Sequence, residues 1–82
     1  MHTSELELSI DEFHISDQSP IQGRTLMESN IRRDHDIIVI GIKRNEEEMQ
    51  FNPRPDTTIL SGDILIILGK ECDISALKTE MR

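Results

Sequence analysis

Asp34, His35 and Asp36 are the residues whose types and adjacency come nearest to a metal site in this sequence. Three consecutive side chains seldom point at one ion, because a metal site depends on the number and geometry of its ligands. Acidic residues beside a histidine at the end of a helix are also common on protein surfaces. Residues 46–48 form a second acidic run, but this run lacks the alternating oxygen ligands of a calcium-binding loop. We therefore predict no metal site.

The side chains that could act in catalysis are scattered through the sequence. No phosphate-binding loop, dinucleotide-binding glycine fingerprint or His-Glu-x-x-His helix is present. Cys72 is the only cysteine, so this chain has no internal disulfide, and we expect Cys72 to be a small residue near a helix start rather than a reactive thiol. A nucleophile needs a base and an orienting group, and no motif supplies that set. We predict that the chain is not an enzyme.

The net charge of −7 disfavours nonspecific binding to nucleic acid or acidic lipid. Residues 24–54 contain six basic and six acidic residues, whereas the rest of the chain contains three basic and ten acidic residues. The central third is therefore where a small anion would be attracted. Alternating charges on a solvated helix face would produce the same composition.

Alternation of apolar and polar residues predicts a first strand, with Leu6, Leu8 and Ile10 on its buried face. Phe13 and Ile15 have the opposite parity, which indicates either a bulge near residues 11–12 or a second short strand. Thr25 and Glu28 have the spacing of a capping box, so a short helix is expected from there to about residue 35.

Two apolar runs predict central strands, over residues 37–43 and 63–68, and the first is expected to be buried on both faces. Between them we expect a turn with Asn45 in a left-handed conformation and a short strand over residues 48–51. The prolines of residues 52–56 exclude a strand there, and Ile74, Leu77 and Met81 mark a final helix.

This order of elements predicts an α+β fold, a small β-α-β-β-β-α sandwich with a mostly antiparallel sheet. The expected core is aliphatic and small for a stable monomer, which favours a homodimer. No apolar run has the roughly 18 residues needed to span a bilayer, and no signal-peptide pattern is evident at the N-terminus. We expect a cytoplasmic domain.

One ordered pattern covers almost the whole chain. It consists of residues 23–28, residues 30–32, the strand over residues 38–45 and the proline-containing segment of residues 52–69. In this order and at these spacings, the sequence resembles the RCK C-terminal (TrkA-C) domain family. The resemblance implies a domain over residues 5–82, preceded by an N-terminal extension of residues 1–4.

The resemblance implies a regulatory function. Domains of this family belong to cytoplasmic regulators of potassium channels, transporters and cation/proton antiporters, and also occur in some organic-acid permeases. They dimerise, and in several members the dimer cleft binds a small ligand, notably cyclic di-AMP. By resemblance, we expect a small anionic ligand, such as a nucleotide or cyclic dinucleotide, and a membrane-embedded channel or transporter as partner.

Ligand-binding residues follow from the same resemblance. Arg32 matches an arginine that contacts phosphate; the other matching pocket positions are Asn30, Ile31, Ile37, Ile38 and Pro53. Ile38 replaces an asparagine that cyclic-dinucleotide-binding members often have, which removes a hydrogen-bond partner for the base. Arg32 is also spaced to pair with Glu28 on the helix surface.

Three hypotheses follow for the function of the chain. The first is a ligand-sensing domain whose dimer gates a transporter. The second is a structural dimerisation module without a ligand. The third and least favoured is a fragment of an enzyme.

Overall fold

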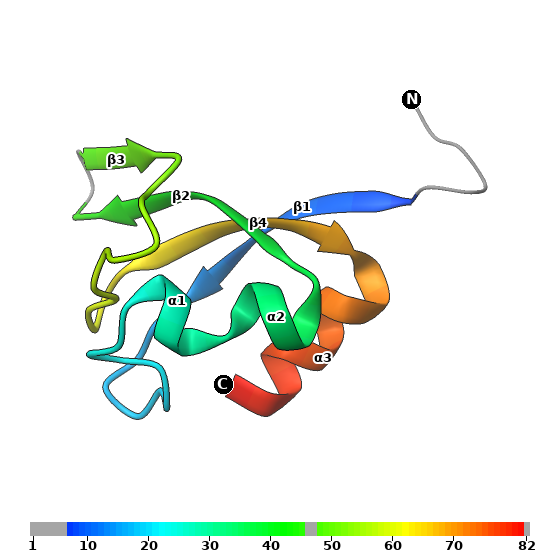
Figure 1. Cartoon of the computed structure of the whole chain (residues 1–82), viewed down its shortest axis with the longest axis horizontal. Coiled ribbons are helices and arrows are strands. Elements are labelled where there is room, and N and C mark those ends of the chain that lie inside the picture. Colours follow the sequence, from blue (N-terminus) through cyan, green and yellow to red (C-terminus); the bar gives the residue numbers. More distant parts are fainter. Residues whose placement is uncertain (1–6, 46–47, 82) are drawn as a thin grey trace.

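The computed structural model describes residues 7–45 and 48–81. Its elements are, in chain order, β1 (Leu8–His14), α1 (Leu26–Ser29), α2 (Ile31–His35), β2 (Ile38–Arg44), β3 (Glu48–Phe51), β4 (Ile64–Lys70) and α3 (Glu71–Met81). The strands form one sheet of order β1-β4-β2-β3, in which every neighbouring pair is antiparallel. All three helices lie on the same side of this sheet (Figure 1). The predicted α+β fold is confirmed.

The core lies between the helices and the inner face of the sheet. Phe13, Leu65 and Ile42 are opposed across three adjacent strands and are all buried, so they define this inner face. Ile31 from α2 and Leu77 from α3 pack onto it and are almost fully buried. No helix in the described part of the chain is long and apolar enough to cross a membrane.

The first strand corrects one sequence expectation. Its pairing with β4 is regular from Leu8 to His14, without a bulge or a second strand. Phe13 faces the helices, whereas Leu8 and Ile10 lie on the opposite face and are exposed. Apolar residues occur on both faces of this strand, and the alternation alone could not tell which face the helices cover. Leu6 lies outside the described residues.

The central strand β2 was expected to be buried on both faces, and in a single chain this is wrong. Ile38 in β2 is 54% exposed, and alternate residues of β4 are only partly buried. The register of β2 against β4 shifts between Val39 and Gly41. Strand β4 also continues past the expected stop at Gly69. A Cβ on Gly69 would lie 3.0 Å from Ile37 Cγ1, so glycine permits close packing there.

The single helix expected after Thr25 is divided in two. Asn30 adopts a left-handed conformation (φ 59°), which ends α1 and begins α2. Asparagine tolerates this conformation better than most residues. The predicted capping box is confirmed: Thr25 Oγ1 accepts from the Glu28 N–H (3.1 Å), and Glu28 Oε1 accepts from the Thr25 N–H (2.9 Å). The latter hydrogen bond holds the pKa of Glu28 below its ordinary value.

The connections after β2 follow the sequence expectations. Asn45 has a left-handed conformation (φ 64°), as predicted, while Glu46 and Glu47 of the same turn lie outside the described residues. The prolines at 53 and 55 lie in irregular structure. Asp63 is buried at the turn before β4, where its Oδ2 accepts from the backbone N–H of Leu60 (2.8 Å). This hydrogen bond closes the turn that leads into β4.

Candidate ligand-binding groove

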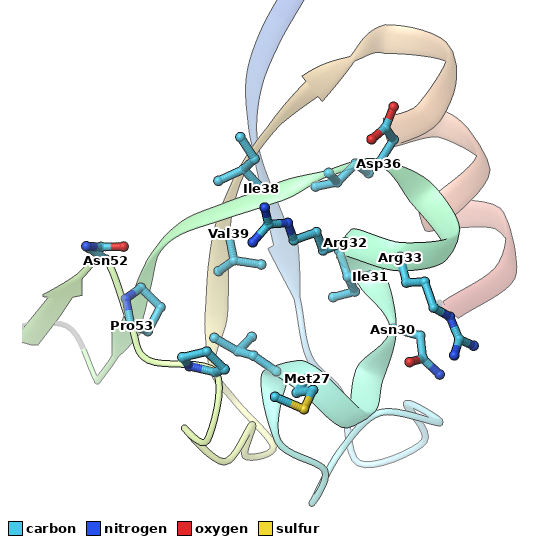
Figure 2. A pocket seen from close by; sticks show the side chains of 13 residues that line it. Met27, Asn30, Ile31, Arg32, Arg33, Asp36, Ile38, Val39, Asn52 and Pro53 are labelled. Carbon is cyan, nitrogen blue, oxygen red and sulfur yellow. The ribbon is translucent and has the colours of Figure 1, made fainter.

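One groove of about 820 Å³ lies beside the first half of β2. Its walls are the two short helices on one side and the loop that follows β3 on the other (Figure 2). Strand β3 pairs only with the second half of β2, from Gly41 to Arg44, so it does not cover Ile38 and Val39. The groove therefore lies beside the part of β2 that β3 leaves unpaired.

The six residues selected by resemblance all line this groove: Asn30, Ile31, Arg32, Ile37, Ile38 and Pro53. They come from α2 and β2, each with its preceding residue, and from the loop after β3. The fold brings these separated segments together. Whether they bind a ligand stays a prediction.

Arg32 provides the positive charge of the groove. In Figure 2 its side chain extends across the groove toward β2, above Val39. The expected alternative partner, Glu28, uses Oε1 to accept from the Thr25 N–H. Among residues 7–45 and 48–81, no ion pair or hydrogen bond involves the Arg32 guanidinium. An arginine without a carboxylate partner is available to an anion.

The neighbouring Arg33 behaves differently. Its Nε donates to Asp34 Oδ1 (3.0 Å), and this hydrogen bond raises the pKa of Arg33 above its ordinary value. Arg33 also lines the groove, but Figure 2 shows its side chain directed away from Arg32 and β2. Arg33 is therefore already paired and serves as a natural control for Arg32.

The apolar residues of the groove differ in how far they are exposed. Ile31 and Ile37 are core residues and are almost fully buried, so they form the base of the groove rather than an open surface. The exposed apolar side chains are Met27, 69% exposed, and Ile38. Met27 was not among the ligand-binding residues selected from the sequence.

Three residues that line the groove have left-handed backbones: Asn30, Asp36 and Asn52. Asn30 and Asp36 cap helices, and the Asn52 N–H donates to the Ile40 carbonyl (2.8 Å). Left-handed residues that are not glycine cluster at functional sites, where the surrounding structure holds them. Asp36 and Asn52 were not among the residues selected from the sequence.

The loop after β3 is fixed to α1 by backbone hydrogen bonds. The Leu26 N–H donates to the Thr57 carbonyl and the Met27 N–H to the Pro55 carbonyl, both at 3.0 Å. Arg44 Nη2 donates to the Thr58 carbonyl at 2.9 Å. The wall that carries Pro53 and Pro55 is therefore anchored at several points before any ligand binds.

A groove with one unpaired guanidinium and an adjacent apolar surface can bind a flat, anionic molecule. Arginine binds phosphate through parallel N–H donors, and apolar side chains can pack against a base. Within the described ranges, no three His, Cys, Asp or Glu side chains are grouped so as to hold a metal ion. His35 Nε2 instead lies 3.0 Å from Glu80 Oε2.

Comparison with known proteins agrees with this geometry. The family model described as the TrkA-C domain matches residues 12–82. The potassium/proton antiporter subunit KhtT of Bacillus subtilis is 31% identical over 71 residues, which cover 87% of this chain and 43% of that protein. The chain thus spans less than half the length of this curated relative.

Two solved structures are similar in fold and sequence. The RCK C domain of the potassium transport protein KtrA, in complex with cyclic di-AMP, has a TM-score of 0.82 and 29% identity, covering 92% of this chain and 85% of that one. The RCK_C domain dimer of Streptococcus agalactiae BusR, also with cyclic di-AMP, has a TM-score of 0.77 and 25% identity, covering 88% of each chain.

Proposed function

The chain belongs to the TrkA-C domain family, and from this membership we propose that it is the ligand-sensing and dimerisation domain of a potassium channel, transporter or cation/proton antiporter. The domain works in the cytoplasm and catalyses no reaction. Its ligand is a small anion, such as a nucleotide or cyclic dinucleotide, held between the grooves of two copies.

The observation that carries this proposal is the position of Arg32. Its guanidinium lies across an otherwise largely apolar groove and has no partner in the described part of the chain. An anion that pairs with an unpaired charge beside apolar side chains binds favourably, because it forms charge-assisted hydrogen bonds with that charge. A core residue or a surface ion pair would leave no such arrangement.

The similar structures support the ligand class. KtrA and BusR domains of this fold, at 29% and 25% identity, are described in complex with cyclic di-AMP. Cyclic di-AMP has two phosphates and two bases related by two-fold symmetry. A homodimer presents Arg32 and Ile38 twice with the same symmetry, so each half of such a ligand would meet an equivalent set of contacts.

Ile38 limits the expected affinity. An aliphatic side chain packs against a base but offers it no hydrogen bond, which lowers discrimination between bases. We therefore expect cyclic di-AMP to bind weakly, or another anion of similar shape to bind better. Sensing then requires that the ligand favour one arrangement of the dimer over another.

Isothermal titration with cyclic di-AMP, mononucleotides and divalent cations tests the proposal. Arg32→Ala should weaken binding of the anion by about 1.5–3 kcal/mol, since a hydrogen bond to a charged group is lost. Arg33→Ala is the matched control and should leave binding nearly unchanged. Binding should also weaken as the salt concentration rises.

A structural dimerisation module is the second candidate, favoured by the aliphatic side chain at Ile38. Such a module would dimerise but bind none of these compounds at millimolar concentration. Equal effects of Arg32→Ala and Arg33→Ala on binding would instead count against a specific contact between Arg32 and phosphate, because they would indicate only a general electrostatic attraction.

A further inference from the structure

His35 is a buried titratable side chain to which anion binding by the groove gives no direct role. It ends α2, and its side chain is only 7% exposed. Its Nε2 lies 3.0 Å from Oε2 of Glu80 on α3. We propose that His35 and Glu80 position the turn of α2 that carries Arg32, and that protonation of His35 thereby strengthens anion binding. This inference rests on the proposed function and adds to it a dependence on pH.

The short length of α2 makes its orientation depend on contacts with its neighbours. The helix has five residues, and an isolated helix of that length is not stable in water. The side chain of Asn30 does not cap its N-terminus. Ile31 and His35, four residues apart, lie on the same side of the helix and are both buried. These two side chains hold the helix against the rest of the domain.

Arg32 and His35 belong to the same turn of backbone. The N–H of Asp36, the residue after His35, donates to the Arg32 carbonyl (3.1 Å). Figure 1 shows α2 beside α3, and the two helices are in contact. A change in the contact between His35 and α3 is therefore transmitted to the backbone of Arg32. His35 does not line the groove itself, so it acts as a positioning residue.

Glu80 is the charged group that faces His35 most closely. Helix α2 packs against α1, α3 and β2. Among residues 7–45 and 48–81, no carboxylate other than that of Glu80 forms an ion pair with His35. The other charged or titratable residues of these elements, and of α2 with its cap, are Glu28, Arg32, Arg33, Asp34, Asp36, Lys43, Arg44, Glu71, Cys72, Asp73 and Lys78.

The charge on His35 determines the strength of its contact with Glu80. Histidine ordinarily gains or loses its proton between about pH 5 and pH 8. Protonated His35 attracts the Glu80 carboxylate, and burial of the ring reduces screening by salt. Neutral His35 can still donate through Nε2, but the attraction between opposite charges is lost. The contact between α2 and α3 is therefore strongest at low pH and weakens as pH rises through the titration of His35.

Protonation also adds a positive charge to the helix that carries Arg32. That charge attracts the same anion, in a domain whose net charge is −7. Both effects have the same direction, so anion binding becomes tighter as pH falls from 8 to 6. Because linkage between two binding equilibria is reciprocal, binding of the anion also favours protonation of His35. The protein should therefore take up protons when the anion binds.

His14 provides a matched control. Its Nε2 lies 3.4 Å from Oε1 of Glu12, so it too has a carboxylate neighbour. Its side chain is 68% exposed, however, and it ends β1 outside the groove. An exposed pair of this kind contributes little. The substitution His14→Gln thus removes a histidine–carboxylate pair without altering α2.

Calorimetric titration with cyclic di-AMP at pH 6, 7 and 8 tests the proposal, since the phosphodiesters of this probe keep their charge over that range. The dissociation constant of the wild type should rise about three- to fivefold from pH 6 to pH 8, the scale of a partly exposed ion pair. His35→Gln should abolish this rise. Glu80→Gln changes an exposed side chain and should reduce the rise, whereas His14→Gln should keep it.

Proton uptake is a second readout, which a loss of packing alone would not change. Titration at pH 7 in two buffers of different ionisation enthalpy should show that the wild type takes up a fraction of a proton per ligand bound. His35→Gln should take up none. Circular dichroism shows whether each variant is folded, and Glu80→Gln carries the test if His35→Gln does not fold.

Three results would overturn this inference and leave the anion site standing. They are wild-type binding that does not depend on pH, a pH dependence that His35→Gln retains, and a full wild-type rise in Glu80→Gln. A protein that binds no anion at any of the three pH values would overturn the proposed function, and this inference with it.

Discussion

The guanidinium of Arg44 forms two parallel hydrogen bonds with the carboxylate of Asp63. Nε lies 2.9 Å from Oδ1 and Nη2 lies 2.8 Å from Oδ2. Asp63 is buried at the turn before β4, and Arg44 ends β2. The same Nη2 also donates to the Thr58 carbonyl, so this pair joins β2 to the loop that forms one wall of the groove.

Asp63 is therefore expected to be structural. Asp63→Ala leaves Arg44 without its carboxylate and the Leu60 N–H without its acceptor, and should lower the free energy of unfolding by about 1.5–3 kcal/mol. Urea denaturation measures this loss. Affinity for the anion should change less than twofold in protein that is still folded, and a collapse of affinity at unchanged stability would make Asp63 a binding residue instead.

We expect that Asn30 stabilises the fold because asparagine tolerates a left-handed backbone. Asn30→Ala places alanine in the left-handed region, where it has no polar side chain to hydrogen-bond locally. This substitution should lower the free energy of unfolding by about 1–2 kcal/mol. Asn30→Gly tolerates the same conformation and should cost less than Asn30→Ala. Thermal unfolding of the two variants compares them directly. If Asn30→Gly were the less stable variant, the side chain rather than the backbone would be the important feature.

Acid should weaken the contact between β1 and α3. Lys78 Nζ lies 2.8 Å from Asp11 Oδ2, and this hydrogen bond holds the pKa of Asp11 below its ordinary value. Because the folded pKa is the lower one, the stabilisation is present above the ordinary pKa of aspartate and is lost as pH falls through the folded value. Both side chains are partly exposed, so the effect should be below about 1 kcal/mol.

Unfolding measured between pH 6 and pH 3 checks this expectation. Asp11→Asn should be less stable than the wild type at pH 6, and the difference should shrink toward pH 3. Asp56→Asn, which changes an exposed carboxylate in the loop before β4, is the control. A difference between Asp11→Asn and wild type that grows as pH falls would contradict the assigned sign.

Ile38 offers a test of base recognition. Ile38→Asn introduces a side chain that can both donate to and accept from a base, and should strengthen binding of cyclic di-AMP by about 0.5–1.5 kcal/mol. Ile38→Val keeps an aliphatic surface and should bind about as the wild type does. Calorimetric titration measures the affinity of each variant for cyclic di-AMP. Equal affinities of the two variants would show that residue 38 forms no hydrogen bond with the base.

The parts of the fold that depend on neighbouring residues were predictable from the sequence. The capping box of Thr25 and Glu28, the turn at Asn45 and the absence of a strand around Pro53 each depend on interactions within a few residues. Their chemistry is local, so a single sequence is sufficient to recognise them.

The features that were missed depend on distant contacts. Alternation does not show which face of a strand the helices cover, so Leu8 and Ile10 were wrongly placed on the buried face of β1, and Phe13 was assigned to a bulge or a second strand. The pairing of Arg44 with Asp63 joins residues 19 positions apart, which no local pattern indicates. Resemblance selected residues that all line one groove, yet it did not select Asp36 and Asn52, which line the same groove with left-handed backbones.

The stoichiometry of ligand binding tests the central claim most directly. Wild-type protein at a concentration where it is dimeric is titrated calorimetrically with cyclic di-AMP. A two-fold site shared by two grooves predicts one ligand per two chains, with binding weakened in Arg32→Ala and retained in Arg33→Ala. One ligand per chain, or a dimer that binds no anion at millimolar concentration, would contradict the account.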